Sequence, residues 1–119
     1  RPDGPPSRPR PAADPEEVLP HPRRGHPGAR TGAHHHGELE SVIYVVSGRA
    51  RMRWGDRLEF ITRAGPGSFL LVPPFMPHQE LNASDTEDLH CALVRSGPEE
   101  IVVNLPDIKI EPDPEWIEF

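Results

Sequence analysis

The sequence predicts an all-β domain, a sandwich or barrel of short antiparallel strands. Segments rich in β-branched and aromatic residues recur roughly every eight to twelve residues, which is the strand spacing of such folds. Gly, Pro and Asp lie between these segments and supply the turns. No window of useful length shows the hydrophobic period of a helix.

The chain has 119 residues, which suits a single domain. Residues 1–27 are rich in proline and are expected to form a largely flexible arm, because they cannot bury enough apolar surface to offset the entropy of ordering. Within the arm, residues 17–19 are an apolar spot that could pair as an edge strand. We expect the barrel to span residues 28–106 and a Pro- and acid-rich tail to span residues 107–119.

The first half of the barrel reads as three strands. Residues 41–46 are β-branched and aromatic, and Gly48 follows their end. In residues 49–54, apolar side chains alternate strictly with arginines, so the two kinds face opposite sides of a strand. After a turn at Gly55, residues 58–61 are predicted to run back as the hairpin partner.

The second half continues the pattern with four further segments. The predicted strands are residues 68–72, 77–82, 89–94 and 101–105. Apolar side chains in the tail are possible docking points on the barrel: Ile108, Ile110, Trp116, Ile117 and Phe119.

Charge, hydropathy and cysteine content argue against several classes of protein. The net charge of −6 argues against a nucleic-acid partner and an anionic membrane surface, since both need a basic patch. No apolar stretch is long enough to span a bilayer, and the N-terminus has no apolar signal region. The single cysteine, Cys91, excludes an internal disulfide. We therefore expect a cytoplasmic protein.

Three consecutive histidines, His34, His35 and His36, are the strongest chemical signal. Residues two apart on a strand point to the same side, so His34 and His36 can share one metal ion. His78, which follows a proline-rich turn, could supply a third imidazole. Glu38 or Glu40 could add a carboxylate, and such a set suits Fe(II), Mn(II), Ni(II), Cu(II) or Zn(II). Taken alone, a histidine run also fits a solvated surface turn.

The spacing of these residues resembles the two sequence motifs of the cupin family. The first motif, G-x5-H-x-H-x3,4-E-x6-G, is matched by Gly28, His34, His36 and Gly48. The second, G-x5-P-x-G-x2-H-x3-N, is matched by Gly67, Pro73, His78 and Asn82, with Phe75 in place of the middle glycine. The resemblance implies a double-stranded β-helix, which is a jelly-roll barrel, with His34, His36 and His78 as metal ligands. It also implies a homodimer.

The carboxylate of the first motif is ambiguous. Counting forward from His36 gives Glu40, whereas counting back from Gly48 gives Ser41. We expect Glu40 to reach the metal through a β-bulge, as a ligand and as the one identifiable general base. The alternative is a three-histidine site with open positions. Gln79 and Tyr44 are candidates to orient the imidazole rings.

These features predict a metal-dependent enzyme that acts on a small organic substrate bound at the metal. An Fe(II)-type oxygenase or related oxidoreductase is favoured, ahead of an isomerase or lyase acting on a carbonyl or sugar substrate. The alternatives are a non-catalytic barrel that binds a metal and a small ligand, and a metal-free sugar-binding barrel. A four-ligand set with a small dry pocket would favour binding, and open positions with a wide mouth would favour catalysis.

Overall fold

The computed structural model describes residues 22–97 and 101–119. They form strands with no helix, and none of the described segments could cross a membrane as a helix. The strands are β1 (Pro22–Gly25), β2 (His34–His35), β3 (Ser41–Ser47), β4 (Ala50–Trp54), β5 (Phe60–Ala64), β6 (Phe69–Val72), β7 (His78–Asn82), β8 (Leu89–Arg95), β9 (Val103–Asn104) and β10 (Glu115–Trp116). The all-β prediction is confirmed.

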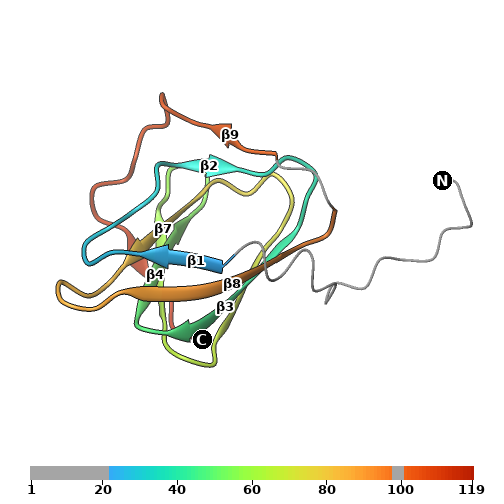
Figure 1. The fold of residues 1–119 in the computed structure, drawn as a ribbon. Coiled ribbons are helices and arrows are strands. Elements are labelled where there is room, and N and C mark those ends of the chain that lie inside the picture. Colours follow the sequence, from blue (N-terminus) through green and yellow to red (C-terminus); the bar gives the residue numbers. More distant parts are fainter. Residues whose placement is uncertain (1–21, 98–100) are drawn as a thin grey trace, which may run out of the picture.

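Two sheets face each other and enclose the core (Figure 1). One sheet has the order β1-β8-β3-β6, and the other has the order β10-β5-β4-β7-β2-β9. Neighbouring strands are antiparallel, apart from the parallel pair of β10 and β5. This arrangement is the jelly roll that the strand pattern predicts.

The core consists of the inward side chains of both sheets. In β8 every second residue is buried, and the same alternation in β3 buries Ser41, Ile43 and Val45. The buried apolar cluster is Ile43, Val45, Ala50, Met52, Ala64, Val72, Leu89, Cys91 and Leu93. Alternation of this kind fixes the register, because a slip of one residue would turn the buried set outward.

The predicted strands lie where the sequence places them, with shifts of a few residues at their ends. The largest shift is in the hairpin partner of β4, which is Phe60–Ala64 and not residues 58–61. Leu58 belongs to the preceding turn, where it has a positive φ of 51° and is fully buried. Leu58 is therefore a turn residue with a buried apolar side chain. The sequence pattern alone could not distinguish it from a buried residue of a strand.

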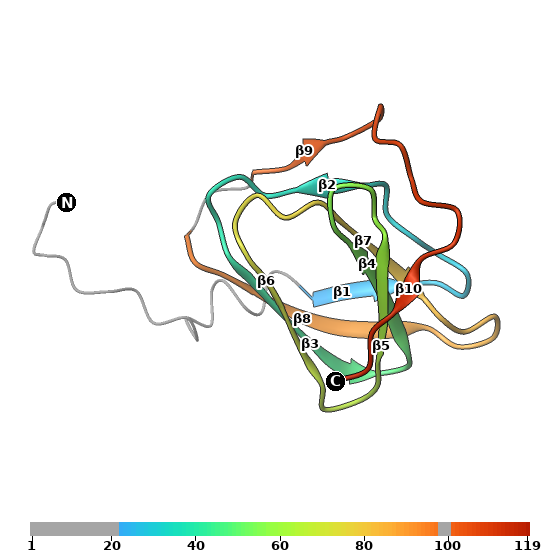
Figure 2. The same cartoon turned by 180° about the vertical axis from the view of Figure 1, so that it is seen from behind.

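Both ends of the described chain add edge strands. The edge strand predicted at residues 17–19 lies outside the described residues, whereas β1 pairs with β8 from Pro22 to Gly25. Pro22 suits this position, because an edge strand tolerates a residue without an N–H group. The tail docks through β10 on β5, and Figure 2 shows this segment running along β5 from behind. There the ring of Trp116 lies 4.6 Å from the Arg63 guanidinium carbon.

Candidate metal centre

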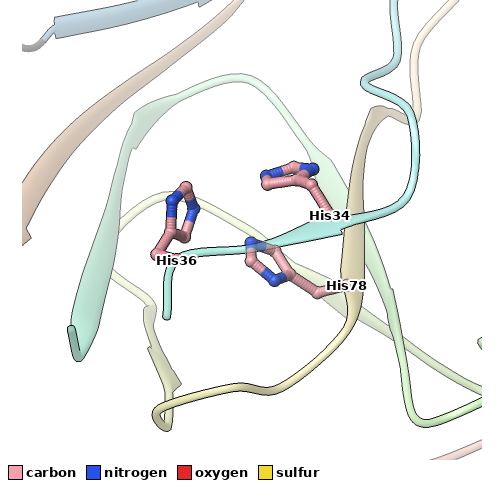
Figure 3. A group of neighbouring side chains, drawn as sticks. All are labelled: His34, His36 and His78. Carbon is pink, nitrogen blue, oxygen red and sulfur yellow. The ribbon is translucent and has the colours of Figure 1, made fainter. Parts of the chain in front are cut away.

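His34, His36 and His78 converge inside the barrel, and Figure 3 shows their rings gathered from two neighbouring strands. His34 on β2 lies directly opposite His78 on β7, with ring centroids 4.4 Å apart. His36 follows β2, and its ring centroid is 5.0 Å from that of His34 and 5.2 Å from that of His78. One nitrogen of each ring lies within 4.8 Å of the others, and all three residues are buried.

Backbone carbonyls fix the tautomer of each ring. Nδ1 of His34 lies 2.8 Å from the carbonyl oxygen of Gly32, and Nδ1 of His36 lies 2.8 Å from that of Ile101. Nδ1 of His78 lies 3.0 Å from the carbonyl oxygen of Met76. A carbonyl only accepts a hydrogen bond, so each Nδ1 carries the proton. Each neutral ring therefore presents the lone pair of Nε2, the form that binds a metal.

The electrostatic surroundings favour neutral imidazole at His36. Burial lowers the pKa of the His36 ring below its ordinary value. The hydrogen bond to the Ile101 carbonyl opposes this shift of the His36 pKa, and electrostatic interactions with the His78 ring, the Arg95 guanidinium and the His34 ring add to it. A neutral ring is ready to ligate without first losing a proton. Nε2 of His78 is also buried, with no hydrogen-bond partner among the described residues. The donor set and its burial fit a divalent transition metal.

The structure does not bring Glu40 to the histidines. Its side chain is exposed, its N–H donates to Oγ of Ser96, and its carbonyl accepts the N–H of Ser96. The irregularity in the pairing of β3 with β8 lies between Val45 and Ser47, so no bulge turns Glu40 inward. Ser41 faces the interior at 2% exposure. The geometry thus supports the backward count of the first motif.

The predicted orienting residues also lie elsewhere. Gln79 donates to the carbonyl of Thr31, and the Tyr44 ring packs on that of Phe69 with centroids 4.8 Å apart. The carbonyls of Gly32, Met76 and Ile101 orient the rings in their place. Side-chain patterns gave no sign of them, because a backbone carbonyl is present at every residue.

Glu80 is the acidic residue that sequence reasoning missed at this site. Its Oε2 lies 3.4 Å from Nε2 of His78 and 4.0 Å from Nε2 of His34. The available signal was the spacing: Glu80 is two residues after His78 on one strand, so both side chains face the same side.

A cavity of about 580 Å³ is lined mainly by residues of β4, β5 and β6, and none of the three histidines is among its lining residues. Its walls include Met52 and Trp54, which pair with Glu80 and His78 across the β4–β7 ladder. Leu70, Val72 and Met76 extend the apolar lining, and Phe119 lies at the wall with its ring 6.3 Å from that of Trp54. The volume falls in the range of small-molecule sites.

The family model of the cupin domain matches residues 24–95, which is more than half of the chain. The chain belongs to the cupin family. The match includes all three histidines and both motifs, and it ends at Arg95, the last residue of β8. No curated protein sequence matches this cupin.

Solved structures share the fold. A Klebsiella pneumoniae protein with a double-stranded β-helix domain has a TM-score of 0.62 and 20% identity, over 70% of this chain and 66% of that one. Oxalate decarboxylase has a TM-score of 0.61 and 24% identity, over 71% of this cupin and 23% of that chain. Oxalate oxidase in complex with glycolate has a TM-score of 0.62 and 15% identity, over 70% and 43%. This cupin therefore spans less than two thirds of each, and the likeness concerns the fold.

Proposed function

We propose that this cupin is a metal-dependent enzyme that acts on a small organic substrate. One divalent transition metal ion would be held on Nε2 of His34, His36 and His78. The observation that carries the proposal is the convergence of three buried imidazoles whose Nδ1 atoms are bound to backbone carbonyls. This preorganisation exceeds what a solvated histidine run requires, since each ring is already oriented for a ligand at Nε2.

Oxidoreductase chemistry of the Fe(II) type is our first candidate. When bound, such an ion supplies Lewis acidity and redox capacity at positions that the protein leaves open. Two of the similar structures are named as oxalate-converting enzymes, which supports a small acid as the first substrate to test. Isomerase or lyase chemistry on a carbonyl compound or sugar uses the same Lewis acidity and remains the second candidate.

The cavity favours catalysis over simple metal storage. A protein that only binds a metal needs little space, whereas the cavity of about 580 Å³ accommodates an organic molecule, and Trp54 on its wall pairs with His78 on the neighbouring strand. Its apolar wall, including Met52, Trp54 and Leu70, would exclude water and orient an apolar part of the substrate.

Elemental analysis of the purified protein tests the site. We expect about one equivalent of transition metal in the wild type and little in His34→Ala or His78→Ala. His35→Ala is the matched control, because the side chain of His35 alternates to the other side of β2 and it should retain the metal. Metal content that is unchanged in all three variants would refute the site.

Oxygen uptake after anaerobic Fe(II) loading tests the reaction class. In a panel of small acids, ketones and sugars, at least one compound should cause oxygen uptake by the wild-type protein. The same compound should cause no oxygen uptake by His78→Ala. Turnover without oxygen consumption would indicate the isomerase or lyase alternative. Absence of any turnover in the loaded protein would favour the non-catalytic binder.

We also propose that the protein is a homodimer that packs through the outer face of the β1-β8-β3-β6 sheet. Three apolar side chains are unusually exposed there: Val46 at 54%, Phe69 at 69% and Leu71 at 61%. The ladder places Leu71 opposite Val42 and Phe69 opposite Tyr44, so they form one contiguous patch. Contiguous exposed apolar side chains of this kind are typical of an interaction surface.

A second copy of this chain suits the patch, because Val46, Phe69 and Leu71 are uncharged and can pack against the same side chains of another molecule without an oppositely charged partner. Residues 1–21 offer only two large apolar side chains, Val18 and Leu19, to cover it. Sedimentation equilibrium should give about twice the 13.3 kDa of one chain. Leu71→Asp should shift the mass to that of a monomer, and Val102→Asp, at a 51% exposed position elsewhere, should not. A monomeric wild type would refute this proposal.

A further inference from the structure

The carboxylate of Glu80 lies close to the metal-binding nitrogens of His34 and His78. Glu80 lies on β7 between His78 and Asn82, and the alternation of the strand turns all three toward the interior. Its Oε2 is 3.4 Å from Nε2 of His78 and 4.0 Å from Nε2 of His34, and its side chain is 27% exposed. The Glu80 carboxylate approaches the Nε2 atoms of His34 and His78, which are the atoms that would bind the metal. It does not approach the Nδ1 atoms, so it is not positioned to orient the rings by a hydrogen bond on the side away from the metal.

We propose that Glu80 is the fourth protein ligand of the metal, in place of the carboxylate of the first motif. This inference rests on the proposed metal centre. At the first-motif position the interior holds only the hydroxyl of Ser41, and Glu40 is exposed with its backbone bound to Ser96. In this arrangement the carboxylate ligand comes from the strand of His78 and not from the strand after His36.

The distances suit donors that share one ion. With metal–donor lengths of about 2.1 Å, two ligands lie about 3.0 Å apart at a right angle and about 3.4 Å apart at a tetrahedral angle. The separation of Glu80 Oε2 from Nε2 of His78 matches this range. Only the three histidines have donor atoms that are all within 4.8 Å of one another among the described residues. Glu80 would therefore rotate toward His36 when the ion binds, and its partial exposure leaves room for this.

Charge balance supports a carboxylate in this set. Arg95 ends β8 with 6% exposure, opposite Ser41 in the ladder, and its positive charge contributes to the lowered pKa of His36. Three neutral imidazoles would leave the full charge of a divalent ion in this buried site. Each buried charge is costly unless it is compensated, and Glu80 supplies a negative charge on the opposite sheet.

Metal titration of the full-length, metal-depleted protein tests the role of Glu80. Glu80→Gln keeps the size of the side chain and removes its charge. It should weaken Mn(II) binding about 100-fold or more, since even groups that only support a ligand contribute about 10–100-fold. The loss should be smaller for Zn(II), because Mn(II) depends more on oxygen ligands. A purely structural ion pair would not discriminate between the two ions.

Two further variants separate the possible results. Glu40→Gln is the matched control and should bind Mn(II) like the wild type, whereas His78→Ala should lose both ions. Wild-type affinity in Glu80→Gln with loss in His78→Ala would overturn the role of Glu80 and leave the metal centre intact. Wild-type affinity in both would refute the centre itself. If Glu80→Gln does not fold, Glu80→Asp should bind Mn(II) with reduced affinity, and unchanged affinity there would also overturn the assignment.

Discussion

Replacing Gly48 with alanine is expected to destabilise the barrel by about 2–5 kcal/mol. Gly48 has a φ of 90°, and in this region an L-residue costs roughly 1–2 kcal/mol. A Cβ added there would lie 2.5 Å from the carbonyl oxygen of Asp88 and 3.0 Å from Cα of Leu89. Both are backbone atoms at the start of β8, so they cannot move aside as a flexible side chain would, and such overpacking costs about 1–3 kcal/mol.

Two other glycines separate the strain from the clash. Gly67 has nearly the same φ, 88°, but a Cβ there would meet nothing within 4 Å, so Gly67→Ala should lose only about 1–2 kcal/mol. Gly65 has neither a positive φ nor a close neighbour, so Gly65→Ala should be neutral or should stabilise by up to about 1 kcal/mol. Urea unfolding of the three variants measures this series. Equal losses in Gly48→Ala and Gly67→Ala would show that the close approach to β8 contributes nothing.

Two further predictions concern the second motif and the histidines. Phe75 stands where the motif has glycine, with a φ of 60° and 59% exposure, so Phe75→Gly should be more stable than Phe75→Ala by about 1 kcal/mol. At an ordinary loop position with negative φ, the alanine variant would be the more stable of the two. Urea unfolding that shows Phe75→Ala to be more stable than Phe75→Gly would therefore contradict the strained backbone at this position. Because the pKa of His36 is lowered on folding, the unfolded chain binds protons first, and the metal-free protein should lose stability as the pH falls below about 6.5. Unfolding free energies at pH 5 to 8 should show a shallower decline in His36→Gln, and identical slopes in the two proteins would disprove the assignment.

The sequence determined the class of fold because strand signals are local. β-Branched segments, strict alternation in residues 50–54 and turn residues at Gly48 and Gly67 each act within a few residues. The three histidines could also be predicted from the sequence. His34 and His36 have the spacing of residues on one strand face, and His78 lies at the histidine position of the second motif. The family model that matches residues 24–95 confirms the family on the same residues.

Tertiary structure decided the remainder of the site. Glu40 and Ser41 are adjacent, and only the pairing of β3 with β8 and β6 decides which of them faces inward. Glu80 reaches His34 because β7 pairs with β2, a contact between residues far apart in the chain. The carbonyl of Ile101 reaches His36 across 65 residues in the same way. Local sequence patterns show which residues of a strand share a face. Long-range strand pairing determines which of these faces lie against each other in the folded protein. The chemistry of the site depends on this second step, because its side chains come from strands far apart in the chain.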